Sequence, residues 1–261
     1  MKKALKYILI FFGLQLLAGV PTVIALGDNA DKGTAIIIAF AISSLLSCVY
    51  FVWNGEVRLA KETFSVRPWT ILIPCLLTLF FFFLPEAAMN ETLDLPDGGL
   101  TDMMESACQT IWGVLVIGVL VPIAEEFVFR GAVLNALLRW DRTYGKPWLA
   151  ILLSALLFSL MHFNLSQLPF TFLIGLLLGW ICWRTGSLLP GIFMHVINNT
   201  IVCFAAMMAE EGEPETLAEY FGSPAVEYLV VGVSLLFCIG TVVYLIRMIQ
   251  THYPAGNSAL Q

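Results

Sequence analysis

The chain consists largely of long apolar stretches, and this feature restricts its fold more than any other. We place the stretches near residues 5–26, 34–53, 68–84, 107–127, 147–164, 168–184, 188–208 and 225–249. Only helices and closed barrels satisfy their backbone polar groups in lipid, and the short alternating segments of a membrane barrel are absent. Because a transmembrane helix needs about 20 apolar residues, the pattern predicts an all-α integral membrane protein with about eight transmembrane helices.

The composition indicates one membrane domain and no soluble one. Of the 261 residues, 59% are hydrophobic and only 12% are charged, whereas soluble domains carry about 25% charged residues. We therefore expect residues 1–261 to form a single polytopic membrane domain in contact with the lipid bilayer. The net charge of −6 and the lack of a basic patch give no reason to expect nucleic acid as a partner.

The first apolar stretch follows Lys2, Lys3 and Lys6 and in this respect resembles a signal peptide. Its apolar part is too long for a signal peptide, and Ile24-Ala-Leu-Gly is a poor cleavage site. We expect this stretch to remain in the protein as a transmembrane helix.

The cysteines lie inside the apolar stretches, and no two of them form a Cys-x-x-Cys pair. A free cysteine in such a place behaves as a small buried hydrophobic residue. The spacing therefore predicts neither a disulfide framework nor a thiolate metal site. The six cysteines are Cys48, Cys75, Cys108, Cys182, Cys203 and Cys238.

Lysine and arginine fall on one side of the predicted topology, and the loops on the other side are acidic. Residues 86–105 hold six acids and no base, and residues 210–219 hold five acids and no base. Because basic loops stay in the cytoplasm, we predict that both termini are cytoplasmic. A bacterial inner membrane fits this charge pattern, and a eukaryotic internal membrane also fits it. The basic residues are Lys2, Lys3, Lys6, Arg58, Lys61, Arg67, Arg139, Arg142, Lys146, Arg184 and Arg247, and Lys32 lies against the trend.

A few ionisable and amide side chains interrupt the apolar stretches. Such groups are costly at bilayer depth and usually mark a functional site. At a rise of about 1.5 Å per residue, their distances along each helix from the basic side are roughly 16 to 24 Å, so we expect them at similar depth. The candidate site residues are Glu125, Glu126, Arg130, His162, His195 and Asn199.

The spacing of these residues assigns them different roles. Glu126 and Arg130 are four residues apart and can form an ion pair on one helix face. Glu125 points about 100° away from Glu126, and it is therefore free to act as a general base. His195 and Asn199 share a face and can donate hydrogen bonds to an oxyanion. His162, from another helix, can orient or share the water, and together these parts predict a membrane-embedded hydrolase, most simply a peptidase.

Simpler explanations remain open for the individual residues. A buried glutamate–arginine pair is as often structural as functional. A single intramembrane histidine or asparagine can serve only to join helices through hydrogen bonds. The agreement in depth between Glu125, His162, His195 and Asn199 favours a site over these explanations.

Three motifs in this part of the chain resemble those of a known family. They are Glu125-Glu126-x-x-x-Arg130, Phe158-x-x-x-His162 and His195-x-x-x-Asn199. In order and spacing they are similar to the motifs of the CPBP intramembrane proteases, also called the Abi family. This group includes CAAX-type prenyl endopeptidases and bacteriocin-processing and immunity proteins. The resemblance covers about residues 107–208, which places the catalytic core in the fourth to seventh helices.

The resemblance implies a mechanism. Glu125 would activate the water and His162 would assist it. His195 and Asn199 would form the oxyanion hole, and Glu126 and Arg130 would support the site. Family members of known activity cleave peptides near a C-terminus, including prenylated peptides, so a peptide or protein in the membrane is the expected substrate. The first three stretches and the last carry no matching motif, and they leave the individual substrate and the oligomeric state undefined.

The resemblance leaves the use of a metal open. Zinc could be held by Glu125, His162 and His195 with one open position. However, the chain lacks the His-Glu-x-x-His pattern that places two zinc ligands and a base on one helix. We favour a glutamate mechanism without a cofactor and keep zinc as the alternative.

Two other functions use the same residues. A proton-coupled transporter could use Glu125, His162 and His195 as a relay, but no motif recurs in the other half of the chain, as inverted repeats would require. A non-catalytic immunity or scaffold protein could keep the fold, although its motifs would then have no reason to remain intact.

Overall fold

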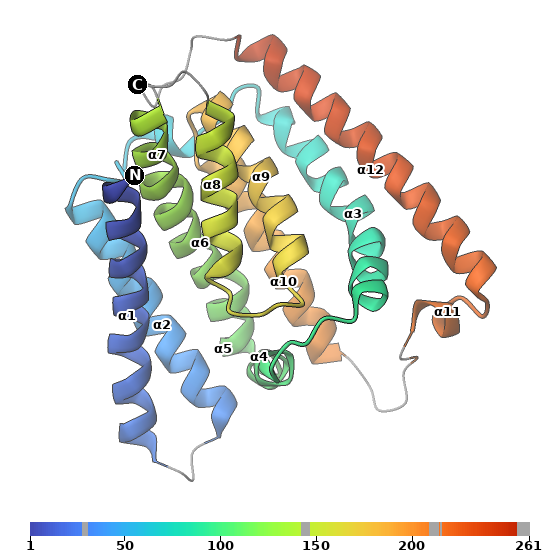
Figure 1. Ribbon diagram of the computed structural model, residues 1–261, viewed down its shortest axis with the longest axis horizontal. Coiled ribbons are helices and arrows are strands. Elements are labelled where there is room, and N and C mark those ends of the chain that lie inside the picture. Colours follow the sequence, from blue (N-terminus) through green and yellow to red (C-terminus); the bar gives the residue numbers. More distant parts are fainter. Residues whose placement is uncertain (28–30, 142–146, 209–213, 215, 255–261) are drawn as a thin grey trace.

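The computed structural model describes residues 1–27, 31–141, 147–208, 214 and 216–254, and within them all regular structure is helical. This confirms the predicted all-α class. Among the described residues, seven helices are long and apolar enough to cross a membrane, and an eighth apolar helix, α8, is shorter. The bundle is shown in Figure 1. Its long helices are α1 (Lys2–Leu26), α2 (Lys32–Trp53), α3 (Leu72–Leu93), α8 (Pro147–Leu160), α9 (Leu168–Thr185), α10 (Leu189–Met208) and α12 (Pro224–His252).

One further helical run, which we call the central helix, extends from Ile111 to Asp141. It consists of α5 (Ile111–Gly113), η3 (Val114–Leu120), α6 (Val121–Glu126), η4 (Phe127–Leu134) and α7 (Asn135–Asp141). The segments η3 and η4 are π-helical. Short π segments inside longer helices occur often at functional sites. The short elements elsewhere are η1 (Lys61–Phe64), η2 (Trp69–Ile71), α4 (Leu100–Cys108) and α11 (Leu217–Tyr220).

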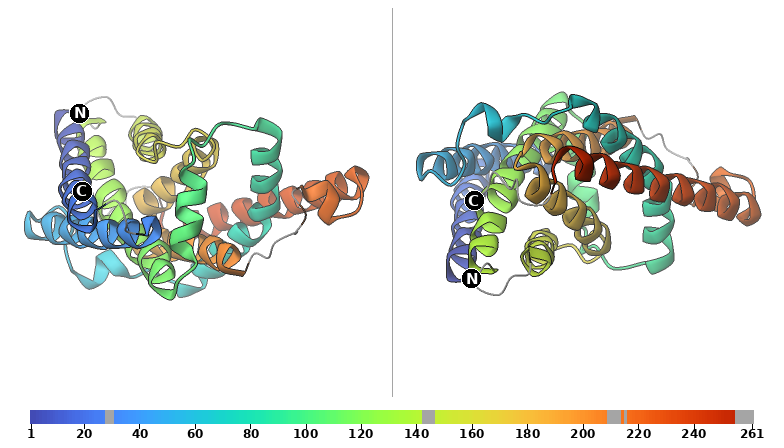
Figure 2. Two further views of the ribbon diagram at one scale, coloured as in Figure 1. Left: turned by 90° about the horizontal axis from the view of Figure 1, so that it is seen from below. Right: turned by 90° about the horizontal axis from the view of Figure 1, so that it is seen from above.

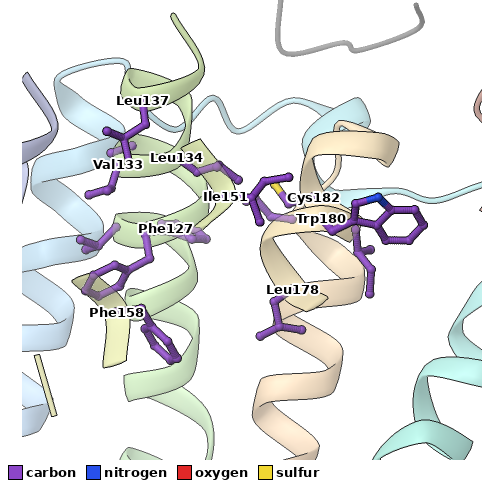
Figure 3. Close-up of a cluster of buried hydrophobic side chains, with 14 of the residues drawn as sticks. Phe127, Val133, Leu134, Leu137, Ile151, Phe158, Leu178, Trp180 and Cys182 are labelled. Atoms are coloured by element: carbon purple, nitrogen blue, oxygen red, sulfur yellow. The ribbon is translucent and has the colours of Figure 1, made fainter. Parts of the chain in front are cut away.

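The central helix is the most buried of the seven membrane-spanning helices. Helices α1 and α2 pack together on one side of it, and α3 and α12 pack together on the other, as Figure 2 shows. Helices α8 and α9 form a hairpin against η4. Buried apolar side chains of η4, α7, α8 and α9 fill the space between these helices, including Leu134, Ile151, Phe158 and Leu178 (Figure 3).

Two helix boundaries differ from the predicted ones. Helix α3 continues to Leu93, so Glu86 and Glu91 lie on a helix and not in the acidic loop that the sequence predicted. Helix α8 ends at Leu160, so residues 161–164 form a turn instead of the end of a span. With 14 residues, α8 is about 21 Å long, which is shorter than the hydrocarbon core of a bilayer, about 30 Å thick.

Most basic residues of the described part of the chain gather at one end, and Lys32, at the start of α2, lies at the other. Lys3 Nζ lies 2.9 Å from Glu56 Oε1, and Arg139 Nη2 lies 3.5 Å from Glu56 Oε2. At the same end, Arg184 donates to the carbonyl of Tyr253 at 2.8 Å. That this end faces the cytoplasm stays a prediction. Arg142 and Lys146 of the predicted basic side, and Glu210, Glu211, Glu213 and Glu215 of the predicted acidic loop, lie outside the described residues.

The prediction for the cysteines was wrong for two of them. Cys108, at the end of α4, forms a disulfide with Cys203 of α10. The two cysteines are 95 residues apart in the sequence, and no cysteine spacing motif predicts a disulfide between residues so far apart. The other four, Cys48, Cys75, Cys182 and Cys238, are free.

Candidate active site

The six predicted residues come from three places in the bundle. Glu125 and Glu126 end α6, and Arg130 lies in the π-helical segment η4. His195 and Asn199 lie on α10, which packs against α6 and η3. His162 lies in the turn that follows α8 and not on a helix.

Glu126 and Arg130 form the ion pair that their spacing predicts. Arg130 Nη1 lies 2.8 Å from Glu126 Oε1, and the two side chains are 1% and 0% exposed. The guanidinium also lies over the ring of Phe158, 4.3 Å from its centroid, which adds a cation–π interaction. Because a buried charge is costly without a partner, this pair is a fixed part of the core beneath the site.

His195 lies between the two carboxylates. Its Nδ1 is 3.0 Å from Glu126 Oε1, and its Nε2 is 3.6 Å from Glu125 Oε2. Glu126 is paired with Arg130 and therefore accepts a hydrogen bond from Nδ1–H. This contact fixes the ring so that Nε2 points at Glu125, whose side chain is 14% exposed. The site thus combines an accessible carboxylate with an imidazole that a buried ion pair holds in place.

The position of Glu126 Oε2 explains why residue 191 is a glycine, a residue that the sequence analysis did not single out. Glu126 Oε2 is buried and has no hydrogen-bond partner. It packs against Gly191, where an added Cβ would lie 2.7 Å from it. The missing side chain at the start of α10 therefore gives the carboxylate room, although no sequence pattern shows this.

Asn199 and Thr200 hold α10 against the central helix. In η3, Val121 N–H bonds to Val116 five residues earlier, and Pro122 has no N–H. In a regular α-helix, the N–H groups of residues 121 and 122 would bond to the carbonyls of Ile117 and Gly118. Here those two carbonyls do not receive these bonds. Asn199 Nδ2 donates to Ile117 at 3.4 Å, and Thr200 Oγ1 donates to Gly118 at 3.2 Å. In this arrangement the Asn199 amide contacts the backbone of η3.

His162 lies beside the site without a hydrogen bond to the glutamates. Its Nδ1 donates to the carbonyl of Phe158 at 3.0 Å. Its ring meets the ring of Phe158 edge-on at 4.9 Å, and Phe158 meets His195 in the same way at 5.6 Å. In the described part of the chain, no hydrogen bond or ion pair joins His162 to Glu125. Phe158, a motif residue without a predicted role, therefore lies in ring contact with both histidines.

The predicted zinc ligands do not converge. Within the residues that the structure describes, no group of three His, Cys, Asp or Glu side chains is placed to hold a metal ion. Glu125 and His195 are close together, but His162 is directed to the Phe158 carbonyl. The donor set as it stands does not match a three-ligand zinc site.

We expect Gly118→Leu to reduce activity about 10- to 100-fold, because small misplacements of catalytic groups have effects of this size. An added Cβ at Gly118 would lie 3.0 Å from Thr200 Oγ1 and 3.1 Å from its Cα, so α10 would have to move away. Gly19→Leu is the matched control, since nothing lies within 4 Å of an added Cβ there. Reaction rates and thermal unfolding of both variants test this. A rate for Gly118→Leu equal to that of Gly19→Leu would contradict it.

Known proteins match the part of the chain that carries these residues. A family model described as "Type II CAAX prenyl endopeptidase Rce1-like" matches residues 107–201, which include Glu125 and Asn199. An Escherichia coli protein described as an uncharacterized 24.3 kDa protein is 30% identical over 166 residues. That match covers 60% of this chain and 73% of the relative. No solved structure matches the chain.

Proposed function

Since this chain belongs to the family of Rce1-like type II CAAX prenyl endopeptidases, we propose that it cleaves lipidated or membrane-associated peptides with a water activated by Glu125. The family and the apolar helices make it an integral membrane protein of the CAAX protease type. The observation that supports the proposed chemistry best is the 3.6 Å approach of His195 Nε2 to Glu125 Oε2 above a buried ion pair.

In the proposed reaction, Glu125 removes a proton from a water whose oxygen attacks the scissile carbonyl carbon. The carbonyl oxygen becomes an oxyanion, which His195 Nε2–H stabilises. Glu125 then gives the proton to the leaving nitrogen, the C–N bond breaks, and a carboxylate and an amine are released. A carboxylate that accepts and returns one proton is general base and general acid in turn.

The arrangement around His195 supports this role. Since Nδ1–H donates to Glu126, Nε2 can donate only when both ring nitrogens carry a proton. The proposal therefore requires a proton on both ring nitrogens of an imidazole that lies between the carboxylates of Glu125 and Glu126. Arg130 keeps Glu126 as an acceptor, and Glu126 keeps His195 directed at the reacting atoms.

The remaining two residues take assisting roles in the proposal. Asn199 joins the oxyanion hole when its amide turns from Ile117, and the length of that contact, 3.4 Å, marks it as weak. His162 assists the water through its Nε2, since Nδ1 is occupied by the Phe158 carbonyl.

The proposed location is a bacterial inner membrane with both termini in the cytoplasm. The charge asymmetry of the loops and the Escherichia coli relative support this placement. Peptides anchored in or lying on the bilayer are the proposed substrates, because Glu125, Arg130 and His195 lie on membrane-spanning helices.

We expect the purified protein to cleave a farnesylated CAAX-type peptide and to stay fully active with less than about a tenth of a metal ion per chain. Activity would be measured in detergent with and without a strong chelator, and metal content would be assayed on the same samples. Loss of cleavage on chelation, with recovery on adding zinc, would establish the zinc alternative. The absence of cleavage of this and of unmodified membrane peptides would count against the proposed function itself.

A further inference from the structure

Cys203, one of the two cysteines of the Cys108–Cys203 disulfide, lies on the same helix as two of the proposed catalytic groups. His195, Asn199 and Cys203 follow one another at intervals of four residues on α10. Residues at this spacing share one helix face. The disulfide therefore fixes the same face that carries the imidazole and the amide, one turn beyond Asn199.

Both cysteines are buried in a small cluster of their own. Cys108, Val114 and Cys203 form it, and Ile117 and Ala206 pack against it. It is separate from the main core of the bundle. The cluster joins three elements, namely α4, η3 and α10, at the end of the molecule opposite the start of α1 (Figure 1).

Besides the disulfide, close packing on η3 and a few polar contacts hold this end of α10. The hydrogen bonds of Asn199 and Thr200 to η3 are 3.4 and 3.2 Å long, which is the weak end of the range. The Gln109 side chain donates to the carbonyl of Ala206 at 2.8 Å, but this bond is exposed. The side chains of Val202, Phe204 and Met208 point away from the bundle and are exposed. The disulfide adds a covalent restraint on how closely this part of α10 approaches the central helix.

We propose that the Cys108–Cys203 disulfide is a redox-dependent clamp that positions Asn199 and His195 against Glu125. This inference rests on the proposed function of the site. When the S–S bond forms, the two thiols lose two protons and two electrons, and a disulfide of an exchange protein or small molecule is reduced to two thiols. Disulfides persist in oxidising compartments, and the predicted orientation puts this end of the molecule outside the cytoplasm. The protease is active when the clamp is closed.

The state of the thiols is the first test, and it requires no activity. Native membranes are denatured and treated with a maleimide polymer before and after reduction. The four free cysteines should react at once, and Cys108 and Cys203 should react only after reduction. Labelling of all six before reduction would overturn the proposal.

The second test follows the position of α10 through the reactivity of His195 toward diethyl pyrocarbonate. In the oxidised protein His195 is shielded by Glu125 and Glu126. Reduction, or Cys203→Ser, should raise its modification rate about tenfold, while the exposed His252 reacts at an unchanged rate. Unchanged reactivity of His195 would overturn the clamp even if no substrate were known.

The third test separates positioning from general stability. In the oxidised protein, reduction should lower kcat at least about tenfold with little change in KM, and reoxidation should restore it. Cys108→Ser, Cys203→Ser and the double variant should share this lower kcat and be insensitive to reductant. A fall in Tm with unchanged kcat of the folded protein would show a structural link only. If the wild type cleaves nothing while the first two tests succeed, the proposed function fails and the clamp stands.

Discussion

The Glu125→Gln variant is expected to fold like the wild type and to lose cleavage by about a thousandfold or more, since a positioned general base contributes about 10² to 10⁴. Glutamine has the same size but cannot accept the proton from water. The nearest charged partner of Glu125 is His195, at 3.6 Å, while the shorter contacts of Glu126 with Arg130 and His195 stay in place. Initial rates with the farnesylated peptide and thermal unfolding of the same preparation measure both parts.

The control for this experiment is Glu62→Gln, which removes an exposed carboxylate from η1. It should cleave at the wild-type rate. Glu125→Gln activity within tenfold of the wild type would show that another group activates the water. If Glu125→Ala left the cellular phenotype intact, the protein would have a non-catalytic role such as immunity or scaffolding.

The Arg130→Met variant is expected to lose about 3 to 5 kcal/mol of stability, the usual effect of leaving one member of a buried ion pair alone. Methionine retains much of the volume of the side chain but not its charge. Glu126 would then remain fully buried with His195 as its one close partner. The cation–π contact with Phe158 would be lost as well. Reversible unfolding in detergent, compared with the wild type, measures the change.

A paired variant tests the electrostatic origin of this loss. Glu126→Gln combined with Arg130→Met removes both charges, and it should recover much of the stability that the single arginine variant loses. It should not recover activity, because His195 would no longer be held by a carboxylate. Equal stability of the single and double variants would assign the loss to packing around Phe158 instead of to the unpaired charge.

Much of the fold and part of the site follow from local sequence patterns. Apolar stretches of membrane-spanning length predicted the helices, because lipid leaves the backbone few alternatives. The Glu126–Arg130 pair followed from a spacing of four residues, which any helix converts into a contact. The position of Glu125 on another face of the same helix followed from the same geometry.

Contacts between distant residues could not be predicted in this way. The placement of His195 between Glu125 and Glu126 depends on how α10 packs on α6. Part of that packing is the hydrogen bonding of α10 to carbonyls that the π-helical turn and Pro122 leave without their α-helical donors. Hydropathy does not predict a π-helical turn. The disulfide joins residues separated by 95 positions. The turn at His162 was missed because apolar residues continue past Leu160, where the helix ends.

The most direct test of the central claim is a comparison of membrane peptides from cells that carry the wild-type protein or Glu125→Gln at equal abundance. Mass spectrometry of peptide C-termini would be used in both strains. We predict a set of new C-termini that appears only with the wild type and whose parent peptides accumulate, uncut, with Glu125→Gln. Indistinguishable sets of C-termini in the two strains would contradict the assignment of Glu125 as the residue that activates water.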